Sequence, residues 1–143
     1  MKDQTNIIVR LANWPAEKSL LRTIREQVFV EEQKVPREIE WDDLDDQSQH
    51  FLAFNQQTEA IACARVLPSG QFGRMAVIKS WRNKGVGRQV LDAIIAYAQA
   101  NQLCLHCHAQ VQAIPFYENA GFIGVGERYM EAGIEHQNMK YKP

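Results

Sequence analysis

A glycine-bearing loop is the part of the sequence best suited to bind an anion. Gly85 and Gly87 follow an apolar segment and precede a long run whose apolar residues have helical spacing. The first amides of a helix have no partner within it, and the helix dipole places about half a positive charge there. Glycines let an oxyanion approach these amides, and Arg82, Lys84 and Arg88 add positive charge. The pattern favours a bound diphosphate.

Two other phosphate-binding motifs do not fit this loop. The chain contains no Gly-x-x-x-x-Gly-Lys-Ser/Thr sequence. Val90 stands where the dinucleotide-binding fingerprint has its third glycine. The pattern that this loop does show is Arg82-x-x-Gly85-x-Gly87 between a strand and a helix. The alternative to an anion-binding loop is a basic turn in which the glycines are needed only for the backbone conformation.

Tyr117 is the main candidate for proton transfer. It stands early in a short helix expected over residues 113–122, directly after a strand, and Gly121 would end that helix. The glycine loop likewise follows a strand. Because ligands bind beyond the carboxyl ends of parallel strands, both segments are expected to flank one cleft. The alternative is that Phe116 and Tyr117 are aromatic core residues.

Histidine and cysteine residues suggest a competing metal site. Alternation would place Cys104, His106 and His108 on one face of a strand, with water, His50 or His136 as a fourth zinc ligand. No second ligand cluster accompanies them, so we interpret them as packing groups and expect no metal.

A cysteine nucleophile would need a thiol whose pKa is lowered by a helix N-terminus or a nearby cation. Cys63, Cys104 and Cys107 are all expected within strands, where a buried and unreactive thiol is the common outcome. Nucleophilic catalysis by cysteine is therefore disfavoured.

Residues 34–49 form the most polar segment of the chain. One interpretation is an acidic lip over a site that accepts cations. The other is a solvated loop or short helix anchored by Trp41 and Leu44. A calcium loop is less favoured, because the glycine and terminal glutamate of the EF-hand pattern are absent.

The apolar patterns predict one α/β domain over residues 1–143. Strands are expected at residues 7–12, 50–55, 60–67, 72–78, 103–109, 122–129 and 136–141, and helices at 15–30, 85–101 and 113–122. The strand, long helix and strand between residues 75 and 109 indicate a parallel crossover. Short connections elsewhere indicate antiparallel hairpins.

Composition excludes several classes of protein. The 143 residues are 45% hydrophobic and 23% charged, with a formal net charge of -1. Such a chain has no broad positive field for nucleic acid or an anionic membrane. No apolar run approaches a membrane span, and the run at residues 7–9 ends too soon for a signal peptide. Three cysteines give no disulfide framework, so a reducing cytoplasm is the expected location.

The element order and three motifs resemble the GNAT superfamily of N-acetyltransferases over nearly the full chain. The motifs are Arg74-Met-Ala-Val77, Arg82-Asn-Lys-Gly-Val-Gly87 and Pro115-Phe-Tyr-Glu-Asn-Ala-Gly-Phe122. Residues 28–33 and 131–136 are further similar to a small bacterial YjcF-like or ElaA-like branch. The resemblance implies a mixed, mostly antiparallel sheet with helices on both faces, and a parallel strand pair that forms an acyl-CoA cleft.

The resemblance also implies a cosubstrate, acetyl-CoA, and residues that hold it. Backbone groups of Met75, Ala76 and Val77 would pair with the pantetheine arm. The diphosphate would lie on the loop formed by Arg82, Asn83, Lys84, Gly85, Val86, Gly87 and Arg88. Tyr117 matches the tyrosine that protonates the departing thiolate in many members. A phenol, with a reference pKa of about 10, keeps its proton at pH 7 and can donate it.

An amine acceptor must lose a proton before it attacks, and several residues could accept it. Glu32 and Glu127, directly or through water, are the candidate bases, and Gln33 and Glu127 the candidate substrate-binding residues. Many members of the family have an asparagine where this chain has Gln110 or Gln112. The contact of that asparagine with the cofactor is therefore left open for this chain.

These residues together predict an enzyme that moves an acetyl group to a primary amine within a ternary complex. The acceptor would be a small amine or a peptide amine, with neither nucleic acid nor membrane as partner and with a homodimer left open. The alternative is a non-catalytic acyl-CoA-binding domain of the same fold.

Overall fold

The structure is a computed structural model that describes residues 6–143; the first five residues of the expected domain lie outside the described residues. The strands are β1 (Ile8–Ala12), β2 (Gln49–Phe54), β3 (Ala60–Val66), β4 (Gln71–Val77), β5 (His106–Gln110), β6 (Phe122–Glu131) and β7 (Ile134–Tyr141). They form one sheet in the order β1-β2-β3-β4-β5-β7-β6. Only β4 and β5 run parallel, so the expected mixed, mostly antiparallel sheet is confirmed.

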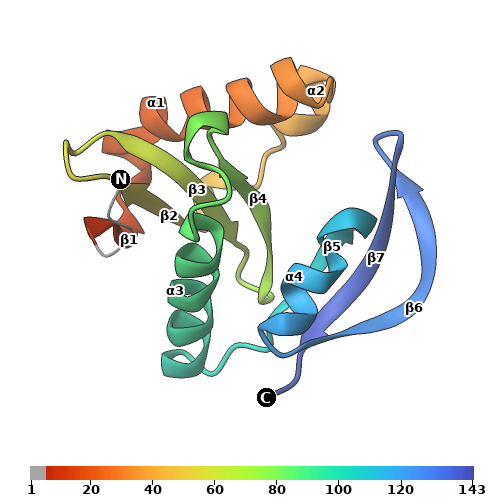
Figure 1. The fold of residues 1–143 in the computed structure, drawn as a ribbon. Helices are drawn as coiled ribbons and strands as arrows, with labels where there is room; N and C mark the ends of the chain where they lie inside the picture. Colours follow the sequence, from red (N-terminus) through yellow and green to blue (C-terminus); the bar gives the residue numbers. More distant parts are fainter. Residues whose placement is uncertain (1–5) are drawn as a thin grey trace.

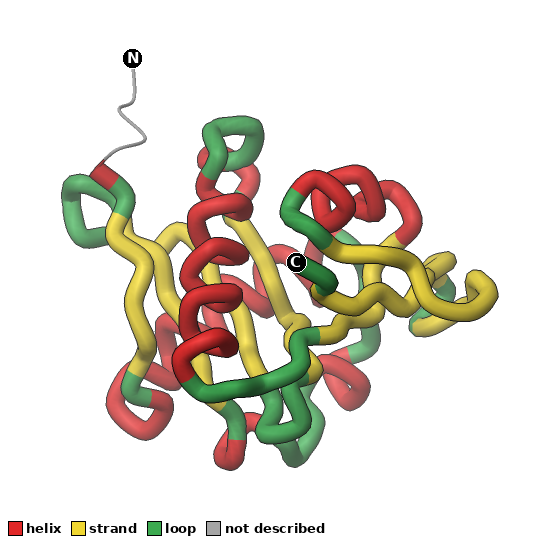
Figure 2. Tube along the Cα trace, turned by 90° about the horizontal axis from the view of Figure 1, so that it is seen from below, coloured by secondary structure: helices red, strands yellow, loops and turns green. Residues whose placement is uncertain are grey.

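Helices cover both faces of this sheet, as expected (Figures 1 and 2). They are α1 (Trp14–Arg25), α2 (Arg37–Glu40), α3 (Val86–Ala100) and α4 (Ile114–Asn119). Short 3₁₀ turns occupy Asp45–Gln47, Lys79–Trp81 and Val111–Ala113. No helix of residues 6–143 is both long and apolar enough to span a membrane.

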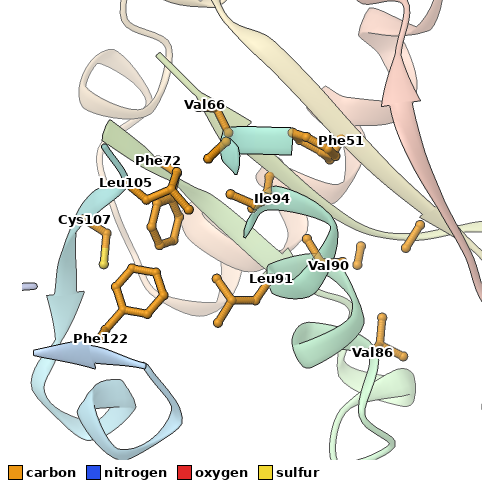
Figure 3. Close-up of a cluster of buried hydrophobic side chains, with 14 of the residues drawn as sticks. Phe51, Val66, Phe72, Val86, Val90, Leu91, Ile94, Leu105, Cys107 and Phe122 are labelled. Atoms are coloured by element: carbon orange, nitrogen blue, oxygen red, sulfur yellow. The ribbon is translucent and has the colours of Figure 1, made fainter. Parts of the chain in front are cut away.

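Helix α3 carries the main core. Its apolar residues recur at helical spacing, and Val90, Leu91 and Ile94 are fully buried. They pack against side chains of both halves of the sheet, among them Phe72 of β4 and Phe122 of β6 (Figure 3). The long helix thereby fixes β4 and the C-terminal strands relative to one another.

Helix α1 covers the opposite face and differs from its expected form. Asn13 caps it, because its side-chain oxygen accepts a hydrogen bond from the amide of Ala16 at 3.3 Å. The expected helix over residues 15–30 is α-helical only to Arg25 and continues as a π-helix over Glu26–Glu32. The wider π-helical turns are frequent at functional sites, and this one ends beside the cavity described below.

The segment 34–49 contains the expected short helix, α2, and its acidic residues Glu40 and Asp42 line the cavity described below, but it is held differently from expectation. Leu44, an expected anchor, is exposed, whereas Glu40 and Asp45 are buried. Their carboxylates lie 2.8 and 2.9 Å from the guanidinium of buried Arg25. Asp45 also contacts Arg65 of β3 at 3.1 Å. Buried ion pairs hold this segment against the sheet. The number of charged residues in the sequence does not show which of them are buried and paired.

Strand β5 also differs from expectation, since it begins at His106 and not at Leu103. Cys104 therefore lies outside the strand and is exposed. Cys63 and Cys107 are buried in strands, and burial raises the pKa of both thiols to about 12. Two of the three thiols are thus unreactive, as expected.

The β6–β7 hairpin is longer than expected and has a two-residue loop. Ala132 and Gly133 both have positive φ, at 52° and 76°. Such a pair matches the twist of the flanking strands and makes a tight hairpin turn. The turn places Glu131 and Ile134 directly opposite each other at the hairpin tip.

Candidate active site

A cavity of about 520 Å³ opens where β4 and β5 separate. The two strands pair only at Gln71 with His106 and at Phe72 with Cys107. Beyond these pairs β4 continues to Val77 and β5 to Gln110 without further pairing. The cavity lies between the end of the π-helix and α2 on one side and the hairpin tip on the other, and Figure 1 shows α2 and this tip at the same end of the molecule.

The glycine loop has the backbone geometry of an open helix N-terminus. Gly85 precedes α3 with a φ of 79°, a conformation that favours glycine, and no side chain caps the helix. Asn83 also has positive φ, at 62°. Val86, the first residue of α3, is buried in the core. The amides at this end of α3 are therefore free of the side-chain cap that most helices use.

Gly87 lies at the contact between α3 and α4. A Cβ atom at this position would lie 3.6 Å from the ring of Phe116, an ordinary contact distance. The backbone therefore does not require glycine at position 87, and its lack of a side chain leaves room beside the first turn of α3.

Arg82 is bound within the protein. Its guanidinium donates to both carboxylate oxygens of Glu32, at 2.9 and 2.8 Å, and to the carbonyl of Val77 at 2.9 Å. The hydrogen bond from Arg82 lowers the pKa of Glu32. Arg82 thus ties the loop to the end of the π-helix and to β4.

Of the expected acceptor-side residues, only Gln33 lines the cavity. It accepts a hydrogen bond from Gln110 of β5 at 3.0 Å. Glu32 and Glu127 are not among the described residues that line it. Glu127 is exposed in β6, where the pairing with β7 is interrupted between Val125 and Tyr129. The structure therefore does not bring the two candidate bases to the cavity.

Tyr117 both packs among aromatic side chains and lines the cavity. Its ring packs at 6.0 Å from Phe72, 5.1 Å from Phe116 and 5.7 Å from Phe122. The residue is only half-buried and lines the cavity. Burial raises the pKa of its hydroxyl, which keeps the phenol protonated.

A histidine–carboxylate pair at the cavity was missed by reasoning from sequence. Nδ1 of His108 lies 2.9 Å from a carboxylate oxygen of Glu131 at the hairpin tip, and both residues line the cavity. The second oxygen of Glu131 is 3.9 Å from Nε2 of His136. Strand alternation predicted that His108 and Cys107 point to different faces of the sheet. A single sequence does not show how β5 pairs with the distant hairpin, and it is this pairing that brings Glu131 close to His108.

The wall opposite this pair consists of ion-paired groups. Arg65 donates to Asp42 at 2.7 and 3.1 Å, and Arg74 donates to Asp42 at 3.0 Å. Burial alone would raise the pKa of Asp42, but the hydrogen bonds from Arg65 and the Leu44 amide, together with the charges of Arg65 and Arg74, lower it. Arg74 itself sits in a β-bulge with a φ of 48°, which turns its side chain toward this network.

The proposed metal ligands do not converge. Within the described residues, no group of three or more His, Cys, Asp or Glu side chains is arranged to hold a metal ion. Nδ1 of His106 contacts the carbonyl of Cys104 at 3.1 Å. His50 is buried on β2, where its ring stacks on Trp14 at 4.3 Å.

Comparison with known proteins decides the family. The model of the acetyltransferase (GNAT) domain matches residues 16–143. The chain belongs to the GNAT family. It is 35% identical over 121 residues to YjcF of Bacillus subtilis (strain 168), an uncharacterized N-acetyltransferase, and this match covers 81% of the chain and 86% of YjcF.

Solved structures support the same GNAT assignment. An acyl-CoA N-acyltransferase from Pseudomonas aeruginosa superposes with a TM-score of 0.81 at 26% identity, covering 99% of this chain and all of the other. Escherichia coli ElaA superposes with a TM-score of 0.81 at 26% identity, covering 95% of this chain and 99% of ElaA. The expected YjcF-like and ElaA-like branch of the GNAT family is confirmed.

Proposed function

We propose that this GNAT protein transfers an acetyl group from acetyl-CoA to a primary amine while both are bound. The observation that carries the proposal is the common position of three features at the separation of β4 and β5. These are the uncapped N-terminus of α3, the unpaired edge of β4 and the cavity that Tyr117 lines. Together they offer sites for a diphosphate, an extended amide-bearing arm and an amine.

The residues present fit acetyl-CoA. Beyond Phe72, β5 supplies no ladder partner to β4, which supports the expectation that backbone groups among Met75, Ala76 and Val77 bond the pantetheine amides. The carbonyl of Val77 already accepts from Arg82. The amide of Ile78 bonds to the carbonyl of Ile61 in β3. In the same ladder Ala76 pairs with Cys63, so the backbone groups of Ala76 also face β3. Met75 is therefore expected to make the main contact.

The diphosphate is expected to lie mainly on backbone amides, from Asn83 to Arg88. Arg82 is engaged by Glu32, and Arg88 pairs with Asp92 of its own helix at 2.9 Å. Arg82 is therefore a positioning residue in this proposal, which holds the loop in its anion-binding shape. Lys84 supplies a mobile positive charge, and Arg88 can supply a second by leaving Asp92.

Tyr117 is expected to act as the acid. Its hydroxyl keeps its proton, because burial disfavours the phenolate. When the carbon–sulfur bond breaks, the hydroxyl gives that proton to the thiolate. Such proton donation typically contributes about 10²- to 10⁴-fold to a rate.

The expected setting is a reducing compartment such as the cytoplasm, with a small amine or peptide amine as the acceptor. The three cysteines are unpaired in the structure, and Cys63 and Cys107 are buried. Disulfide formation has no part in the fold of the described residues.

The test is a survey of acceptor amines with acetyl-CoA, in which release of the free CoA thiol is measured. The survey includes polyamines, amino sugars, amino acids and peptides. Amine-dependent thiol release with matching acetyl-amide formation supports the transferase. Tight acetyl-CoA binding by calorimetry with no release for any amine supports the alternative, a non-catalytic acyl-CoA-binding domain.

A further inference from the structure

His108 occupies a special position on its strand. It is the first residue of β5 beyond the two pairs that join β5 to β4. Its neighbour Cys107 points into the core, whereas His108 is exposed and lines the cavity. The imidazole therefore lies where the sheet opens, on the wall across from the π-helix.

Glu131 fixes how the ring of His108 is protonated. A carboxylate can only accept, so the Nδ1 atom of His108, 2.9 Å from Glu131, must carry a proton. In the neutral ring, Nε2 then holds the free lone pair, and no described residue hydrogen-bonds to it. This is the tautomer that a base directed into the cavity requires.

The other groups around the cavity are less suited to accept a proton. Nδ1 of His136 lies 2.7 Å from the carbonyl of Ile134, and its Nε2 faces the carboxylate of Glu131. Asp42 is held by two guanidinium groups and its pKa is lowered, so it is a weak base. Burial raises the pKa of Glu40, but its carboxylate is buried between Arg25 and Arg74, at 2.8 and 3.1 Å, and is little exposed to an amine.

We propose that His108, oriented by Glu131, is the base that deprotonates the acceptor amine. The inference rests on the proposed acetyl transfer. Nε2 of His108 takes one proton from the ammonium, which leaves a lone pair on nitrogen to form the bond to the thioester carbonyl carbon. The carbon–sulfur bond breaks, and the sulfur receives a proton from Tyr117. The second amine proton restores the Tyr117 hydroxyl, and His108 releases the first proton to solvent.

Glu131 is a positioning residue in this scheme. It also stabilises the imidazolium that forms when Nε2 binds the proton, because its charge lies 2.9 Å from the ring. The ring of Tyr129 stands edge-on to His108 at 5.9 Å and stacks on His136 at 6.0 Å. One aromatic ring thus lies beside both imidazoles.

The first measurement is steady-state kinetics of His108→Ala and Glu131→Gln with the acceptor found above. His108→Ala is expected to lower kcat/KM about 10²- to 10⁴-fold with unchanged CoA affinity by calorimetry. Glu131→Gln should cause a smaller loss. His106→Ala on the same strand and Glu135→Gln in the same hairpin are the matched controls, since neither lines the cavity.

The pH profile separates catalysis from a structural role. Wild-type kcat/KM should fall toward acidic pH, because an imidazolium has no lone pair to accept a proton, and His108→Ala should lose this dependence. The titratable and charged groups that line the cavity with His108 are Cys107, Tyr117, Glu131 and His136 on its own side and Glu40, Asp42, Arg65 and Arg74 across the cavity. A wild-type rate and an unchanged profile in a folded His108→Ala variant would overturn the proposal.

The second measurement needs no turnover. Nitrogen-15 spectra of the ligand-free protein at alkaline pH should show His108 protonated at Nδ1 and unprotonated at Nε2, and Glu131→Gln should weaken this preference. A ring protonated at Nε2 in the wild type would also overturn the proposal. Absence of thiol release with every amine would count against the transferase, while these spectra test the histidine pair by themselves.

Discussion

In the proposed mechanism, the ring of Tyr117 packs against the core and its hydroxyl donates the proton. Its ring belongs to an aromatic group with Phe72, Phe116 and Phe122, while the residue also lines the cavity. No described residue hydrogen-bonds to its hydroxyl. A residue of this kind can lose the hydroxyl without losing the packing of its ring.

Tyr117→Phe is therefore expected to lower kcat about 10²- to 10⁴-fold and to change the melting temperature little. Acetyl-CoA affinity should also change little, because a single hydrogen bond contributes about 0.5–1.5 kcal/mol. Kinetics and thermal melting on one preparation check both statements. A less stable variant with normal turnover per folded molecule would instead assign Tyr117 to the core alone.

A second prediction for a single residue concerns whether Glu32 holds the glycine loop or acts as the base. Its pKa is lowered by the hydrogen bond from Arg82, and it does not line the cavity. Glu32→Gln should therefore raise the KM for acetyl-CoA by loosening the glycine loop, with a much smaller effect on kcat. If kcat falls 10²-fold or more at saturating acetyl-CoA, Glu32 is the base after all.

Among the elements, helix α1 depends on an ionised group at its N-terminus. Glu17 accepts from the amide of Asn13 at 2.9 Å and from the guanidinium of Arg10 at 2.9 and 2.6 Å. The hydrogen bonds from Arg10 and from Asn13 lower the pKa of Glu17 to about 2. The carboxylate thus connects β1 to the first turn of α1.

A lowered carboxyl pKa stabilises the folded state only while the group is ionised. Above about pH 4.3, the ordinary pKa of glutamate, Glu17→Gln should cost about 1 kcal/mol, since the pair is partly exposed to solvent. The difference from wild type should shrink below that pH and vanish near pH 2. Denaturant unfolding across this range is the measurement, with exposed Glu31→Gln as control. A difference that does not depend on pH would contradict this role for the charge.

At the scale of the whole molecule, the buried charges join elements that are distant in sequence. Arg25 of α1 holds Glu40 and Asp45, and Arg65 and Arg74 of the sheet hold Asp42. Removal of one partner leaves an uncompensated buried charge, which typically costs 3–5 kcal/mol.

Arg25→Met is expected to reduce the free energy of unfolding by about 3–5 kcal/mol. The control is Arg22→Met, at an exposed position of the same helix, which should reduce this free energy far less. Chemical denaturation of both variants gives the comparison. Equal stability of the two variants would mean that segment 34–49 is held by its apolar side chains.

The sequence predicted those features that repeat along the chain or lie within one short segment. Apolar spacing located the strands and α3, and the glycine loop was placed correctly before that helix. The pairing of Arg82 with Glu32, 50 residues apart, and of His108 with Glu131 was not predicted. Both depend on how the π-helix and the hairpin tip approach the sheet, which is set by tertiary packing.

The short junction between β4 and β5 has a consequence for selectivity. The sheet has two sections, β1–β4 and β5–β7, and the parallel ladder between them has two residue pairs. Behind this junction, α3, Phe72 and Phe122 form the core that holds the two sections together. The distance between the cavity walls is therefore set more by side-chain packing than by backbone hydrogen bonds. A change of side-chain volume in this core, away from every polar group of the cavity, is expected to change which amines fit.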